Sequence, residues 1–80
     1  MMTDRDYVSD VFRLLLERAH VARQKAHDQS AGPEDSAFAA GLMQGYYETI
    51  SVMLGQLEAF GIERASVAVP EDLSPERDLL

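Results

Sequence analysis

Two long stretches of this chain repeat apolar residues at steps of three and four, and one Gly-Pro break separates them. In the first stretch the steps are 4, 3, 4, 3 and 4, through Val8, Phe12, Leu15, Ala19, Ala22 and Ala26. This is the spacing of one helix face. Tyr7, Val11, Leu14 and Val21 widen that face on one side. Thr3 and Asp6 have the spacing of a capping box, so a helix is predicted over about residues 4–29.

The second stretch has the same period and stops at a glycine. Its main apolar series is Ala39, Met43, Tyr46, Ile50, Met53, Leu57 and Phe60, and Gly61 follows. Pro33 suits the first turn of a helix. A loop over residues 30–33 and a second helix over about residues 34–60 are therefore predicted. Because the loop is short, the two helices are expected to form a long antiparallel hairpin, which makes the fold all-α.

The predicted second helix is apolar around most of its circumference. Between residues 36 and 60 only Glu48 and Glu58 are charged. Such a helix normally lies in an interior, and a two-helix hairpin has none. We therefore expect a homodimer in which two hairpins form a four-helix bundle. The C-terminal segment or a different protein would also bury the apolar surface of the second helix.

A series of mostly small residues marks one side of the second helix and predicts where the partner binds. Its steps are again 4, 3, 4, 3 and 4, through Gly41, Gly45, Glu48, Val52, Gly55 and Ala59. A glycine inside a helix costs about 1 kcal/mol relative to alanine. Close approach of another helix would explain three of them, and a softened exposed face is the other interpretation. With Tyr47 and Leu54 added, these residues are the predicted dimer or partner interface.

Glu48 is the one charge in this series. A charge in a helix interface is expensive unless it is paired. The second helix contains no base, whereas the first contains Arg13, Arg18 and Arg23. A contact between Glu48 and one of these arginines, within or between hairpins, is therefore a hypothesis.

Residues 63–80 lack a helical period and hold five acids against two bases. We predict an acidic, extended, irregular tail here, separate from the helical hairpin of residues 1–62. Ser74 and Pro75 have the pattern of one helical turn. Leu79 and Leu80 form an apolar end that can dock on the bundle or on a partner, and a frayed tail is the alternative.

The composition of the chain limits the classes of function that it can have. The chain has 80 residues, no cysteine, and 14 acids against 7 bases, for a net charge of -7. This excess of acids disfavours binding to nucleic acid and to anionic membranes, because both bind protein surfaces rich in Lys and Arg. The acidic N-terminus without an apolar run, and the absence of any apolar run of about 18 residues, predict no signal peptide, no membrane span and a cytoplasmic location.

The sequence contains no motif that is characteristic of a particular enzymatic reaction. Glu17 and His20 have the Glu-x-x-His spacing of di-iron bundles, but they fall on the polar side of the first helix. The leading interpretation is a small soluble bacterial protein–protein interaction module without catalytic activity or cofactor. It would be an adaptor, an immunity-like inhibitor or a regulatory subunit, working as a homodimer, with a basic protein surface as a further candidate partner. The alternatives are a metal-binding helical bundle using Glu17 and His20, and an acidic mimic of nucleic acid.

Overall fold

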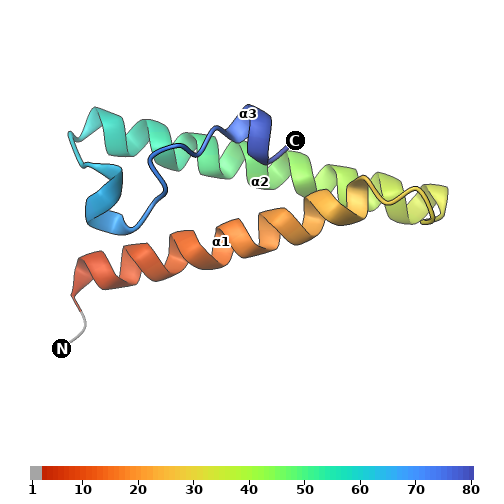
Figure 1. Ribbon diagram of the computed structural model, residues 1–80, viewed down its shortest axis with the longest axis horizontal. Coiled ribbons are helices and arrows are strands. Elements are labelled where there is room, and N and C mark those ends of the chain that lie inside the picture. Colours follow the sequence, from red (N-terminus) through yellow and green to blue (C-terminus); the bar gives the residue numbers. More distant parts are fainter. Residues whose placement is uncertain (1–2) are drawn as a thin grey trace.

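Two long antiparallel helices and a C-terminal segment that folds back along them make up the protein (Figure 1). The computed structural model describes residues 3–80. Helix α1 spans Asp4–Ala26 and helix α2 spans Pro33–Ala59. A 3-10 turn, η1, covers Arg64–Val67, and a single-turn helix, α3, covers Pro75–Asp78.

The prediction of an all-α helical hairpin is confirmed, and the described chain contains no strand. Residues 1 and 2, where the predicted hairpin unit begins, lie outside the described residues. Dimerisation of the hairpin into a four-helix bundle stays a prediction.

Local hydrogen bonds set both ends of α1. At its start the Thr3 hydroxyl accepts from the Asp6 N–H at 3.1 Å, and the Thr3 N–H donates to the Asp6 carboxylate at 2.9 Å. This is the predicted capping box, and the hydrogen bond from the Thr3 N–H to the Asp6 carboxylate is the main cause of the lowered pKa of Asp6. At the other end α1 stops at Ala26 instead of about residue 29. The Asp28 carboxylate accepts from both the N–H and the hydroxyl of Ser30, which holds a turn and competes with the helix.

Helix α2 begins one residue earlier than predicted, at Pro33, and ends at Ala59. Its C-terminal end is closed by a Schellman motif. Gly61 has a φ of 66°, and the Ile62 N–H donates to the Leu57 oxygen at 2.8 Å. Glycine suits this left-handed position because it has no Cβ to clash.

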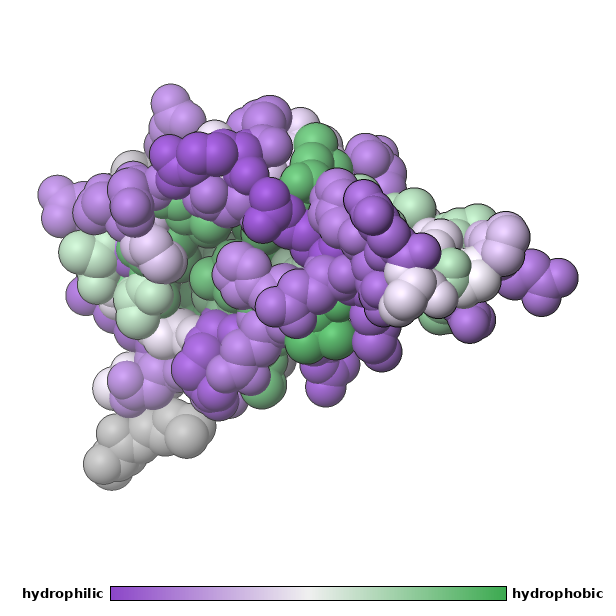
Figure 2. All heavy atoms as spheres, turned by 45° about the vertical axis from the view of Figure 1, so that its right-hand side comes forward, coloured by the Kyte–Doolittle hydropathy of each residue, from purple (hydrophilic) through white to green (hydrophobic). Residues whose placement is uncertain are grey.

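The core lies where the C-terminal segment meets both helices. Helix α1 contributes Phe12 and Ala19, and α2 contributes Ile50, Leu54 and Leu57. The C-terminal segment contributes four more buried residues, which are Val67, Val69, Leu73 and Leu79. Residues 63–80 are therefore packed on the hairpin and not frayed, and the helical turn expected at Ser74 and Pro75 is present. Polar side chains cover much of the outside, with apolar residues visible between them (Figure 2).

Two arginines bind main-chain oxygens of this segment, Arg23 from α1 and Arg64 from within the segment. Arg23 of α1 donates from Nε to the Leu80 oxygen at 2.9 Å. Arg64 in η1 donates from Nη1 to the Leu73 oxygen at 2.9 Å and to the Pro70 oxygen at 3.2 Å. Each guanidinium satisfies acceptors that the irregular backbone would otherwise leave unpaired.

Because Leu79 is only 1% exposed, its truncation tests whether the C-terminal segment belongs to the folded unit. Leu79→Ala should lower the free energy of unfolding by about 2–5 kcal/mol, through lost burial and a cavity. Val52→Ala is the control, since Val52 is 64% exposed and its truncation should change stability by less than about 0.5 kcal/mol. Urea unfolding followed by circular dichroism measures both. Equal, small effects would show that the segment does not unfold with the hairpin.

A carboxylate at α3 makes the fold sensitive to acid. The Arg77 guanidinium, at 2.8 Å, and the Ser74 N–H, at 3.0 Å, hold the pKa of Asp78 down at about 2. A folded-state pKa below the unfolded value of about 3.9 stabilises the protein at higher pH, and this contribution is lost as the pH falls from about 4 through 2.

We expect Asp78→Asn to remove this contribution. The melting temperature of the unmodified protein should fall more steeply between pH 4 and pH 2 than that of the variant. NMR titration of the Asp78 carboxyl should give the low pKa directly. Parallel melting curves for the two proteins over this range would contradict the assignment.

Candidate interaction surfaces

The predicted interface residues fall on two sides of α2. Six are exposed and form what we call the small-residue face: Gly41, Gly45, Glu48, Val52, Gly55 and Ala59. A Cβ added to any of its three glycines would meet no atom of residues 3–80 within 4 Å, the glycine's own chain neighbours and helix backbone aside. Packing within the chain therefore gives no reason for glycine on this face.

The other two predicted residues are covered by the chain's own C-terminal segment. Leu54 is 8% exposed and packs in the core. Tyr47 is half-buried, and its hydroxyl donates to the Glu76 carboxylate at 3.1 Å. That carboxylate raises the pKa of Tyr47, because it favours the protonated phenol. Cover by the C-terminal segment was one of the three expected ways to bury α2, and it accounts for this side of the helix.

Glu48 is exposed and forms no ion pair with any residue between 3 and 80. Arg13 instead pairs along its own helix with Asp10 at 2.7 Å and Glu17 at 3.0 Å. Arg23 binds the C-terminal segment. The hypothesis of a Glu48–arginine contact within the hairpin is therefore wrong, and its version between hairpins stays a prediction.

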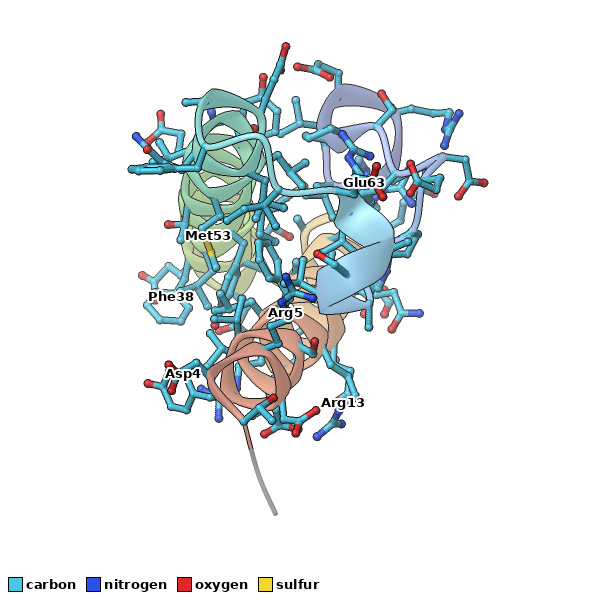
Figure 3. All side chains as sticks on the ribbon, turned by 90° about the vertical axis from the view of Figure 1, so that its left-hand side faces the viewer. Asp4, Arg5, Arg13, Phe38, Met53 and Glu63 are labelled. Carbon is cyan, nitrogen blue, oxygen red and sulfur yellow. The ribbon has the colours of Figure 1, made fainter. Side chains whose placement is uncertain are left out.

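The side of the hairpin away from the C-terminal segment carries a band of apolar side chains. Figure 3 shows Phe38 and Met53 projecting on that side, opposite the segment that starts near Glu63. We call this band the uncovered face and define it by the residues Tyr7, Leu14, Val21, Leu42, Tyr46, Met53 and Phe60. On α1 the members are spaced by seven residues, which places them in one line along the helix.

Much of this band is open to solvent. Tyr7 is 66% exposed, Val21 48% and Phe60 75%. Sequence analysis placed Tyr7, Leu14 and Val21 correctly, as the flank of the first apolar face. On α2, Tyr46, Met53 and Phe60 belong to the main apolar series predicted from the sequence, whereas Leu42 lies outside it.

A groove between the helices lies within the uncovered face. It has a volume of about 340 Å³, and its apolar walls include Val21, Leu42 and Tyr46. Arg18 and Lys25 line it on the α1 side. Toward the hairpin turn it continues into a second hollow of about 370 Å³ that shares Lys25 and Leu42 and adds Asp35 and Phe38. Glu17 of α1 and Asp28 of the turn also line these hollows, so bases and acids both border the groove.

The residues considered for metal binding do not converge. Glu17 and His20 are both exposed on α1, and Glu17 is held by Arg13. Across residues 3–80 no group of three or more His, Cys, Asp or Glu side chains is arranged to hold a metal ion. In the same part of the chain, neither long helix carries an apolar stretch sufficient to cross a bilayer.

Comparisons of the chain with protein-family models, with curated proteins and with solved structures find no match.

Gly45 offers a test of the small-residue face. Since Gly45→Ala fills open space on an exposed helix, it should raise the free energy of unfolding by about 0.5–1 kcal/mol. Gly61→Ala is the matched control, and it should lower stability because Gly61 has a φ of 66°. Urea unfolding measures both changes. A loss of stability in Gly45→Ala would mean that another helix packs closely on this face.

Proposed function

We propose that this protein is a non-catalytic protein–protein interaction module that acts as a homodimer, in which a second copy covers the uncovered face. The observation that supports the proposal is the band itself. The C-terminal segment closes one side of the hairpin, while five of the seven apolar residues that define the other side stay exposed. Contiguous exposed apolar patches on small domains mark sites of association.

The band runs along both helices at matching levels. Val8 and Leu57 line one hollow, and Val21 and Leu42 line another, so the register of the two helices is defined near both ends. The three α1 members of the band therefore lie beside its α2 members. Together they form a surface along the long axis of the hairpin.

Besides the residues that face the other helix of the hairpin, each helix has a second line of residues, here called its second seam. This seam repeats at the three- and four-residue steps of a helical bundle. On α1 it runs through Tyr7, Val11, Leu14, Arg18, Val21 and Lys25, in steps of 4, 3, 4, 3 and 4. On α2 it runs through Leu42, Tyr46, Thr49, Met53, Gln56 and Phe60, in the same steps. A helix in a four-helix bundle packs against two neighbours and needs two seams. The hairpin supplies one neighbour to each helix, and a second copy would supply the other.

The size of the hairpin fits a dimer interface. The molecule measures 44 by 26 Å across its two long dimensions, and α1 and α2 both lie along the longest of these. A standard interface buries roughly 800 Å² on each partner. A molecular face with an outline of 44 by 26 Å is large enough to bury that area on each partner.

Three of the four acids of α2 lie outside the proposed interface. Glu48 lies on the small-residue face, and Glu34 and Glu58 are also exposed on α2. With a net charge of -7 for each chain, this outer surface suits a basic protein partner. Such a partner would make the dimer an adaptor, an inhibitor or a regulatory subunit.

Charge placed on the uncovered face tests the homodimer. Analytical ultracentrifugation should show a particle of twice the 8.9 kDa chain mass for the unmodified protein. Leu14→Glu should raise the dimer dissociation constant at least about tenfold, because burying an apolar side chain contributes about 1.5–3 kcal/mol. Circular dichroism checks that the variant stays helical.

Val52→Glu is the matched control, since it adds the same charge on the small-residue face, where Val52 is 64% exposed. The dissociation constant of the Val52→Glu dimer should equal that of the unmodified dimer. A monomeric unmodified protein would refute the homodimer. Dissociation by Val52→Glu but not by Leu14→Glu would move the interface to the small-residue face.

A further inference from the structure

The proposed homodimer leaves open how the two copies are oriented, and the inference that follows rests on that proposal. We infer that α1 of each copy packs on α2 of the other, with both hairpin turns at the same end of the bundle. The symmetry axis then runs along the helices. The contact at the turn end joins Lys25 of one copy to the partner's Asp35.

Two orientations can bring the uncovered faces together with two-fold symmetry. An axis along the helices places α1 on the partner's α2 and keeps the turns together. An axis across the helices places α1 on the partner's α1 and α2 on the partner's α2, with the turns at opposite ends. Neighbouring helices are antiparallel in both, so helix dipoles do not distinguish them.

The charges of the two helices distinguish the orientations. Helix α2 contains four acids and no base: Glu34, Asp35, Glu48 and Glu58. Of these, only Asp35 lines the groove of the uncovered face. Helix α1 brings Arg18 and Lys25 to the edge of the uncovered face, together with Glu17, whose charge is paired with Arg13 at 3.0 Å. Pairing α1 with the partner's α2 places Lys25 against the partner's Asp35, so one pair of opposite charges forms at that edge.

Position along the helix supports the same orientation. Lys25 and Asp35 line the same hollow near the hairpin turn, so they lie at similar levels along the long axis. An axis along the helices preserves these levels, and it brings Lys25 to the level of the partner's Asp35. The reverse contact forms at the same end, so the dimer gains the pair twice. An axis across the helices would carry Asp35 to the far end of the bundle.

A single cysteine measures the orientation. The chain has no cysteine, and Ser30 is exposed in the hairpin turn, so Ser30→Cys accepts one nitroxide label per chain. Double electron–electron resonance then gives the distance between the two turns of a dimer. We expect a distance below about 25 Å, because neighbouring helices pack about 8–10 Å apart.

The outcomes separate the two proposals. A distance near the 44 Å length of the molecule would overturn the inferred orientation and leave the homodimer intact. A monomer mass with no dipolar coupling would refute the homodimer and the orientation together. Mixing labelled with unlabelled chains should reduce the coupling in proportion and confirm that it arises between copies.

Charge reversal in separate chains tests the inferred pair itself. When Lys25→Glu chains are mixed with Asp35→Lys chains, mixed dimers should exceed the statistical proportion, since only they restore opposite charges across the interface. Native mass spectrometry counts the species. Glu48→Lys chains replace Asp35→Lys as the control, because Glu48 lies on the small-residue face, and they should mix statistically. Equal mixing in both experiments would overturn the Lys25–Asp35 contact.

Discussion

The fold depends on the packing of the C-terminal segment into the cleft between α1 and α2. Leu79, Phe12 and Ile50 are each no more than 2% exposed, and they come from the three parts of the chain. Two helices alone cover only one face of each other, so a hairpin of this length has a contact but no interior. The third layer creates the interior. Its backbone follows no regular element for most of its length, and Arg23 and Arg64 provide the hydrogen bonds that this backbone needs.

Because the C-terminal segment covers only one side, it leaves the two helices unequal. Helix α1 has charged residues on its outer surface, whereas α2 has few charges on any side. The segment covers the part of α2 that holds Leu54 and Tyr47. The opposite side of the hairpin keeps the apolar band, and this imbalance leads to the proposed association.

The hairpin could be predicted from the sequence because its cause is local. A period of three and four residues specifies a helix, and the break at Gly32 and Pro33 separates two of them. The path of residues 63–80 could not be predicted in the same way. Their buried side chains, Val67, Val69, Leu73 and Leu79, follow no period, and they are ordered by contact with helices far away in the sequence.

The interface residues show a second limit of periodicity. On α2, apolar or small residues recur in steps of four and three on three sides of the helix, so the period identifies a helix without saying which side meets which neighbour. The structure places Leu54 toward the chain's own core and Gly45 toward solvent. Only the position of the C-terminal segment separates the side that is already buried from the sides that remain free.

A chain of 80 residues can bury only a limited core. A second copy on the uncovered face would add Val21, Leu42 and Phe60 to the buried surface of each chain. Association would then stabilise the folded hairpin by mass action, and folding and binding would depend on the same apolar residues. In the proposed dimer this linkage would account for the large exposed apolar side chains beside a core that the C-terminal segment has already closed.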